Sequence, residues 1–344
     1  MVGRLRDAGA VIVGKTTTME FAIGLPEASK PFPVPVNPWR AECWPGGSSS
    51  GSASGVSAGF FLAAIGTDSA GSIRIPAAFC GVTGLMPTFG RVPTGGCIPL
   101  AFSLDRVGPL ARTAWDCAAV LEVIDSPDFL SRIEDGLAGL RIGVMREHHL
   151  DGAEPEVVAC FEAAVAALGE LGAEVCEVRA PLYHELVATT LLTLWSEACA
   201  YHRSDLRTRW TDYTRTARTM MAAGAFVSAA DYVQAQRVRR AGQRKLAELL
   251  AEVDLIAAPT VSMPAPALEQ AMSPGHTARV HTMYWNSLGN PVLALPIGFT
   301  DGMPLGMQLA AAPFSEALLL RAGRAFQNHT DWHRRAPDLE VAHG

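Results

Sequence analysis

The stretch from Pro45 to Thr88, PGGSSSGSASGVSAGFFLAAIGTDSAGSIRIPAAFCGVTGLMPT, decides the fold of this chain. More than half of it is Gly, Ser and Ala, a composition typical of a flexible linker. Its apolar runs, GVSAGFFLAAIGTDS and IRIPAAFCGVTGL, nevertheless contain enough Phe, Leu, Ile and Val to be buried. Small residues within apolar segments indicate close backbone packing, with main-chain groups presented to a ligand. We therefore interpret residues 45–88 as an active-site core with two serine-bearing glycine loops.

The second glycine loop, GTDSAGSIR at 66–74, has the features of a nucleophile turn. A serine that follows a run of small residues can be exposed on a sharp turn, and the N–H groups from Ser69 to Ser72 can converge on one point. That arrangement is an oxyanion hole with its nucleophile attached. The first loop, 46–52, supplies hydroxyls that could relay a proton. Ser72 has Ala70 and Arg74 at −2 and +2, so the G-x-S-x-G elbow of α/β-hydrolases is not indicated.

A serine hydroxyl needs a base to activate it. A lysine held neutral by burial is the natural candidate, and the chain has three lysines: Lys15, Lys30 and Lys245. No histidine lies in a glycine-rich setting, so each is predicted to be solvated or to have a packing role. The nine histidines are His148, His149, His184, His202, His276, His281, His329, His333 and His343.

Composition limits the classes of protein that the chain can belong to. With 344 residues, 49% of them hydrophobic and 18% charged, it can bury a large core. A net charge of −6 gives no reason to expect a nucleic-acid surface. The seven cysteines form no C-x-x-C pair, which argues against a zinc site and a disulfide framework. We predict a cytoplasmic protein without metal, cofactor, membrane span or secretory leader.

Hydrophobic periodicity predicts alternating strands and helices, and hence an α/β fold. The pattern of residues 140–178 predicts a strand-helix-strand unit whose two strands pair in parallel. Residues 85–99 are predicted to form a loop. The predicted strands are 10–14, 140–144, 173–178, 255–258, 291–297 and 305–309. The predicted helices are 2–8, 54–64, 113–124, 155–171, 183–209, 229–253, 283–288 and 316–330.

The two glycine loops carry a resemblance to a known family. GGSSSGSA followed by GTDSAGSIRIPAAFCGVTGL is similar to the motif of the amidase signature family, serine hydrolases that cleave carboxamides. Further similar segments follow in family order at 103–113, 254–260, 290–299 and 304–309. The resemblance implies a single large α/β domain over 1–344, with a central mixed β-sheet covered by helices on both faces. Residues 45–88 are its Gly/Ser-rich core and 181–253 its variable helical region.

The resemblance also implies a Ser-Ser-Lys triad and its residues. The nucleophile corresponds to Ser72, and the bridging serine, held by a cis peptide bond, corresponds to Ser48. The reaction implied is attack of Ser72 on an amide carbonyl, release of ammonia or an amine, and hydrolysis of the acyl-enzyme. The oxyanion hole corresponds to the backbone of Ser69, Ala70, Gly71 and Ser72. Supporting roles fall to Ser49, Asp68 and Arg74.

The lysine of the triad is the departure from the family pattern. In the family it lies in a strand well upstream of the segment that corresponds to GKTTTMEFA, and no segment here is similar to that strand. Lys15 corresponds to a structural position, a lysine at the end of the predicted strand 10–14. Met86 stands where family members commonly have lysine. The resemblance therefore implies that the N-terminal part is missing together with its lysine, so that activity of the chain is doubtful.

Two other functions remain open beside a stand-alone amidase with a small-molecule amide substrate. One is an A-type subunit of a glutamyl-tRNA amidotransferase, although no clear glutamine-recognition motif is found in the middle region. The other is a catalytically inactive binding paralogue. A homodimer is possible in each case.

Several charged and aromatic residues have more than one possible role. We expect Asp68 to hold the second loop through backbone N–H groups and Arg74 to pair with a carboxylate beneath the site. Asp105 and Arg106 could form a local ion pair or be surface charges. A substrate pocket or simple packing would suit Trp195, Tyr201 and Trp210. A solvated helix face is expected for Arg237, Arg239, Arg240, Arg244 and Lys245.

Overall fold

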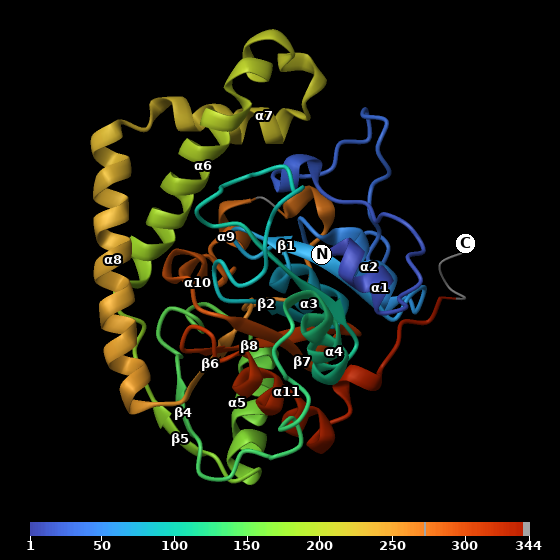
Figure 1. Ribbon diagram of the computed structural model, residues 1–344, viewed down its shortest axis with the longest axis vertical. Helices are drawn as coiled ribbons and strands as arrows, with labels where there is room; N and C mark the ends of the chain where they lie inside the picture. The colour runs from blue at the N-terminus through green and yellow to red at the C-terminus, as the bar shows by residue number, and fades with distance from the viewer. Residues whose placement is uncertain (272, 340–344) are drawn as a thin grey trace.

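The computed structural model describes residues 1–271 and 273–339, so the end of the predicted domain, including His343, lies outside the described residues. Its centre is one eight-stranded mixed sheet in the order β1-β3-β2-β7-β8-β6-β4-β5 (Figure 1). The strands are β1 (Ala63–Asp68), β2 (Thr83–Met86), β3 (Arg106–Ala111), β4 (Arg141–Val144), β5 (Glu174–Glu177), β6 (Leu255–Pro259), β7 (Val292–Thr300) and β8 (Met303–Ala311).

The sheet combines a parallel end with a longer antiparallel part. β4 pairs in parallel with β5 and β6, as predicted for the strand-helix-strand unit that includes α5 (Pro155–Glu170). All the other neighbours are antiparallel, and β7 and β8 form a hairpin through a turn at Asp301 and Gly302. The predicted mixed sheet is therefore confirmed.

Helices cover both faces of the sheet, and the alternation along β6 shows how. Leu255 and Ala257 belong to the core beneath α4 (Ala114–Asp125), α5 and α11 (Glu316–His329). Ile256 and Ala258 point to the other face, into a core shared with α6 (Tyr183–Thr208), α8 (Ala229–Glu252) and α10 (Met283–Leu288). Side chains alternate between faces along a strand, so one short apolar run serves both cores. α2 (Ser50–Ser57) and α3 (Arg74–Cys80) pack in a further cluster against β3 and β7.

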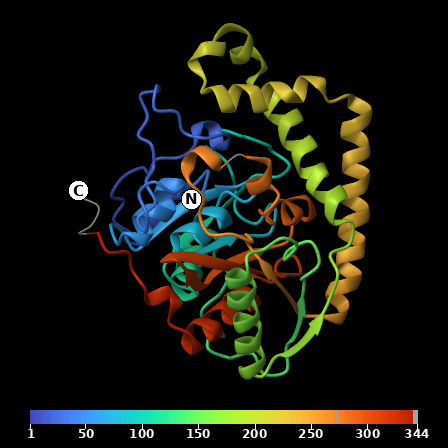
Figure 2. The ribbon, with the colours of Figure 1, turned by 180° about the vertical axis from the view of Figure 1, so that it is seen from behind.

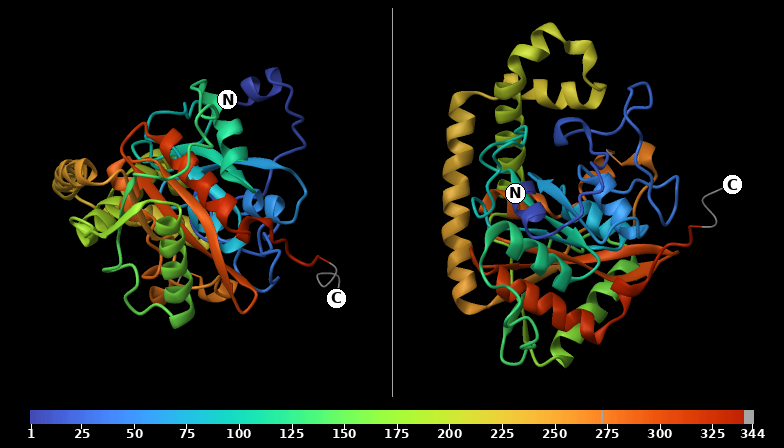
Figure 3. Two further views of the ribbon diagram at one scale, coloured as in Figure 1. Left: turned by 90° about the horizontal axis from the view of Figure 1, so that it is seen from below. Right: turned by 45° about the vertical axis from the view of Figure 1, so that its right-hand side comes forward.

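The long helices α6 and α8 form an arm along one flank of the molecule, with α7 (Arg215–Ala223) at its end (Figures 2 and 3). A capping box begins α8, since Ser228 accepts from the N–H of Asp231 and the Asp231 carboxylate accepts from the N–H of Ser228. Thr113 begins α4 in the same way, through a capping box with Asp116. Within residues 1–271 and 273–339, no helix is long and apolar enough to cross a membrane.

The predicted strand at 10–14 is wrong. The chain enters through α1 (Val2–Asp7) and then runs as an extended segment outside the sheet, with Val11 and Val13 exposed. A β-branched run forms a strand only where it finds a partner strand and a face to bury. Among the described residues the outer edge of β1 is taken by side chains at the start of α2 instead. The Ser49 hydroxyl bonds both N–H and C=O of Thr67, and the Ser52 hydroxyl donates to the Ile65 carbonyl.

Segments around the two glycine loops also differ from prediction. The helix predicted at 54–64 is α2, which begins earlier and ends before Gly59, whose φ of 76° breaks the helix. The loop predicted from 85 overlaps the end of β2. β3 was not predicted, because its sequence RVGPLA contains Gly and Pro, which are depleted in strands. Pairing of β3 with β2 stops at Leu110, next to Pro109, whose nitrogen has no hydrogen to donate.

Candidate active site

Ser72 lies in the turn between β1 and α3, 9% exposed, with its loop packed against the segment before α10. The turn needs glycine at position 71, where φ is 127°. A Cβ atom there would collide with the side chain of Thr282, so no side chain fits. The small residues of the second loop therefore allow a close approach of backbone to a neighbouring segment, as the sequence indicated.

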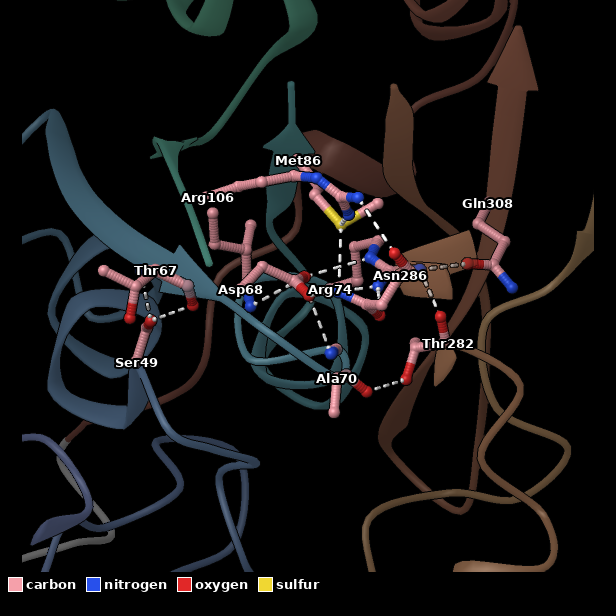
Figure 4. A network of polar contacts seen from close by, with 12 residues as sticks. Ser49, Thr67, Asp68, Ala70, Arg74, Met86, Arg106, Thr282, Asn286 and Gln308 are labelled. Atoms are coloured by element: carbon pink, nitrogen blue, oxygen red, sulfur yellow. Dashed lines mark hydrogen bonds and ion pairs between the residues drawn. The ribbon is translucent and has the colours of Figure 1, made fainter. Parts of the chain in front are cut away.

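Asp68 holds the second loop from beneath. Its carboxylate accepts from the N–H of Gly71 at 2.7 Å and from the N–H of Ile73 at 3.2 Å. It also forms a fully buried ion pair with Arg74 and accepts from the Asn286 amide (Figure 4). Burial alone raises the pKa of Asp68, but Arg74, Asn286 and Arg106 outweigh it and hold the pKa below its ordinary value. The hydrogen bonds predicted from backbone N–H groups to Asp68 and the predicted pairing of Arg74 with a carboxylate are present, and the supporting roles of the two residues stay a prediction.

The first glycine loop lies beside Ser72. The Ser49 N–H donates to the Ser72 carbonyl at 3.1 Å, and the Ser49 hydroxyl is bonded to Thr67 in β1 (Figure 4). The peptide bond between Gly47 and Ser48 is cis. Ser48 is 4% exposed, and its carbonyl accepts from the N–H of Met19. The structure thus brings the two predicted serine loops together.

The backbone N–H groups of the second loop divide into two kinds. That of Gly71 is bonded to Asp68, so it is not free to meet a substrate. In the described part of the chain, the N–H groups of Ser69, Ala70 and Ser72 have no hydrogen-bond partner. Three of the four N–H groups predicted for the oxyanion hole thus have no partner among the described residues, and the oxyanion hole itself stays a prediction.

Asp105 and Arg106 are neither an ion pair nor surface charges. The Asp105 carboxylate accepts from the Ser69 hydroxyl and from the N–H groups of Leu100 and Ala101. Burial raises its pKa. Arg106 points into the sheet, 2% exposed, and donates to the Met86 sulfur and the Asn286 carbonyl. Burial lowers the pKa of Arg106 to about 9. Both residues support the loops from inside, which an exposed-looking Asp-Arg pair in the sequence did not indicate.

None of the three lysines forms a hydrogen bond to Ser48 or Ser72 among the described residues. Lys15 is exposed on the extended segment, not at the end of a core strand as predicted, and it lines a cavity of about 600 Å³ with Trp39 and Arg40. Lys30 donates to the carbonyls of Thr211 and Asp212. Lys245 is exposed on α8.

The remaining candidates have packing or surface roles. Trp195 packs against a core cluster beside α6, whereas Tyr201 and Trp210 are 55% and 40% exposed. The Arg-rich face of α8 is exposed except at Arg239. That side chain donates to the carbonyls of Ser287 and Ser103, which corrects the prediction that it is solvated.

Sequence reasoning missed three polar residues that complete the network beneath Ser72: Thr282, Asn286 and Gln308. Arg74 donates to the Thr282 carbonyl, the Asn286 side-chain oxygen and the Gln308 side-chain oxygen. They lie more than 200 positions after Arg74. For Asn286 and Gln308 the signal was a polar residue within the apolar segments of α10 and β8, which marks a buried hydrogen-bond network but not its partners, and Thr282 just before α10 had no such signal.

Comparisons with known proteins agree with this architecture. A family model described as "Amidase" matches residues 1–320. The A-type subunit of the glutamyl-tRNA(Gln) amidotransferase from Roseiflexus castenholzii is 39% identical, over 98% of this chain and 77% of that protein. The solved structure of the same subunit from Thermotoga maritima is 34% identical, with a TM-score of 0.85 over 96% of this chain and 76% of that one. The peptide amidase of Stenotrophomonas maltophilia is 28% identical, with a TM-score of 0.83 over 98% of this chain and 77% of that one.

A mixed sheet with two glycine-serine loops at its edge thus defines the class, an enzyme of the carbon–nitrogen hydrolase type. The chain belongs to the amidase signature family.

Proposed function

We propose that the chain is an amide hydrolase in which Ser72 is the nucleophile and Ser48 relays its proton. One observation carries the proposal: Ser72 closes a turn whose N–H groups at Ser69, Ala70 and Ser72 are without partners among the described residues, above a buried Asp68–Arg74 pair. Unpaired backbone donors at a rigid turn are what a developing oxyanion requires. The substrate is a small carboxamide.

The proposed reaction has two steps. The Ser72 oxygen attacks the amide carbonyl carbon, and the carbonyl oxygen takes up negative charge facing the free N–H groups. The carbon–nitrogen bond then breaks, and ammonia or an amine leaves with the proton that the Ser72 hydroxyl gave up through Ser48. In the second step water attacks the Ser72 ester, so that the carboxylic acid is released and the hydroxyl is restored.

The rate is expected to be low. Both steps need a base, and none of the three lysines is bonded to Ser48 or Ser72 among the described residues. Lys15 and Lys245 are exposed, and Lys30 donates to two backbone carbonyls. A positioned base is worth about 10²–10⁴-fold in rate. We therefore expect slow acylation of Ser72, which a small primary amine in the buffer accelerates by acting as the base.

The test is covalent labelling by a fluorophosphonate, followed over time with and without methylamine. Labelling should be slow, faster with methylamine, and absent in Ser72→Ala. Ser48→Ala should label more slowly than the unmodified chain. Ser50→Ala is the matched control, because the Ser50 hydroxyl is turned away to the Gly46 carbonyl. Equal labelling of the unmodified chain and Ser72→Ala would refute the nucleophile assignment.

A second function is favoured by the names of the curated relatives, which are A-type subunits of glutamyl-tRNA(Gln) amidotransferases at 34–39% identity. In that role, the chain would release ammonia from glutamine at the same serine. Ser72-dependent conversion of glutamine to glutamate, without turnover of simple carboxamides such as benzamide, would select this alternative. The reverse pattern would select the stand-alone amidase.

A further inference from the structure

The peptide unit between Ala70 and Gly71 is held at both of its polar ends. Its N–H, that of Gly71, donates to the Asp68 carboxylate at 2.7 Å. Its carbonyl, that of Ala70, accepts from the Thr282 hydroxyl at 2.7 Å (Figure 4). The unit is flanked by the N–H groups of Ala70 and Ser72, which have no partner among the described residues. Because these groups share the backbone torsions of Ala70 and Gly71, any rotation of the central unit changes where they point.

Thr282 is itself fixed from several sides. It is fully buried, and its carbonyl accepts from Arg74, the partner of Asp68. The preceding residue is anchored by three further contacts. The Gln308 amide donates to the His281 carbonyl at 3.1 Å, and the two His281 ring nitrogens bond the hydroxyls of Tyr183 and Ser262 at 2.8 and 3.0 Å. The hydroxyl of Thr282 is thus presented to the loop by a rigid corner.

We propose that Thr282 is a positioning residue for the oxyanion loop. Its hydroxyl sets the plane of the 70–71 peptide unit and thereby aims the N–H groups on either side at one point. The effect on catalysis rests on the proposed function, whereas the hydrogen bond between Thr282 and Ala70 does not depend on it. Thr282 touches neither the serine hydroxyls nor the substrate in this scheme and acts through Ala70.

The experiment measures equilibrium binding of phenylboronic acid by ¹¹B NMR. Boron adds to the Ser72 oxygen, the serine proton passes to solvent, and the tetrahedral adduct carries its negative charge where the oxyanion would form. An equilibrium affinity does not depend on a catalytic base. Thr282→Val keeps the shape and removes the hydroxyl, so its affinity should fall at least about tenfold, the effect of one lost buried hydrogen bond. Thr282→Ser keeps the hydroxyl and should bind within about threefold of the unmodified chain.

A second readout separates the two proposals. Amide hydrogen exchange of the peptide containing Gly71 should be faster in Thr282→Val and unchanged in Thr282→Ser. If the unmodified chain forms no Ser72-dependent adduct, the proposed function fails and hydrogen exchange alone decides the role of Thr282. The positioning role of Thr282 would be overturned by an unchanged rate of amide exchange in Thr282→Val, and equally by an unchanged affinity of that variant for phenylboronic acid. Should Thr282→Val not fold, Thr282→Ala, which also lacks the hydroxyl, takes its place.

Discussion

At the scale of single residues, the centre of the molecule is the buried pair of Asp68 and Arg74. Every hydrogen-bonding position of the Asp68 carboxylate is used, by two backbone N–H groups, the guanidinium and the Asn286 amide. Such a pair is costly to desolvate, and it is retained only where its remaining hydrogen bonds are made. Here those bonds define the backbone of the loop that carries Ser72, so the pair shapes the site directly.

Asp68→Asn should therefore destabilise the protein strongly. The substitution leaves the Arg74 charge buried without its counter-ion, and breaking a buried pair in this way costs about 3–5 kcal/mol. Urea unfolding measures the free energy change. Asp135→Asn is the matched control, because its pair with Arg132 lies at the surface with the arginine 79% exposed, and such pairs contribute little. A similar, small change for both variants would contradict the central role of Asp68.

At the scale of elements, the start of α2 closes the edge of the sheet with hydroxyl groups. Ser49 and Ser52 bond the outward-facing polar groups of Thr67 and Ile65 in β1, where another strand would otherwise pair. An open strand edge invites pairing with other chains, and proteins cover or block such edges. The serine-rich composition of the first loop thus has a structural reason besides any role in proton transfer.

Ser49→Ala should lower stability and increase association. It leaves the N–H and C=O of Thr67 without their shared partner, which is expected to cost about 1–3 kcal/mol. Urea unfolding measures the first effect and light scattering during mild heating measures the second. Ser54→Ala, further along the same helix, is the control, since the Ser54 hydroxyl donates to the Val36 carbonyl and not to the edge of β1. If both variants behave like the unmodified chain, the edge-blocking role of Ser49 is wrong.

At the scale of the whole molecule, buried histidines make stability depend on pH. Burial lowers the pKa of His149 to about 4 and that of His281 well below its ordinary value. The ionisable groups around His149 are His148, Asp151, Tyr183 and His281. An unfolded chain takes up protons on these histidines below about pH 6.5 while the folded chain does not. The contribution of the neutral histidines to the free energy of unfolding is therefore complete above about pH 6.5 and is lost as the pH falls below that value.

Thermal unfolding between about pH 7.5 and 4.5 checks this dependence. The melting temperature should fall with decreasing pH, with on the order of 3 kcal/mol lost through His149 alone by about pH 4. His149→Asn removes the titrating group and can still donate to the Glu147 carbonyl, which His149 now bonds. Its acid slope should be shallower than that of His184→Asn, a substitution of the exposed neighbour of Tyr183. Equal slopes would show that His149 does not titrate on unfolding.

The parts of the fold that could be predicted from the sequence are those with local signals. α5 and α8 have long amphipathic periods and clear starts, and the hairpin of β7 and β8 has its Asp-Gly turn. β3 was missed, and a strand was wrongly predicted at 10–14, because pairing with a neighbour decides whether an apolar run becomes a strand. In the site, the two loops and the separate contacts of Asp68 and Arg74 could be predicted, but that the two residues pair with each other was not. Thr282, Asn286 and Gln308 act through tertiary contacts that no local pattern encodes.

The distance along the chain between Arg74 and its later partners has a consequence during synthesis. Arg74 and Gln308 are separated by 234 positions, and β2 pairs with β7, so both loops leave the ribosome long before the segments that fix them. At about 5–20 residues per second, that interval is roughly ten to fifty seconds. Ser72, the proposed nucleophile, can therefore gain its ordered surroundings only after Gln308 has left the ribosome.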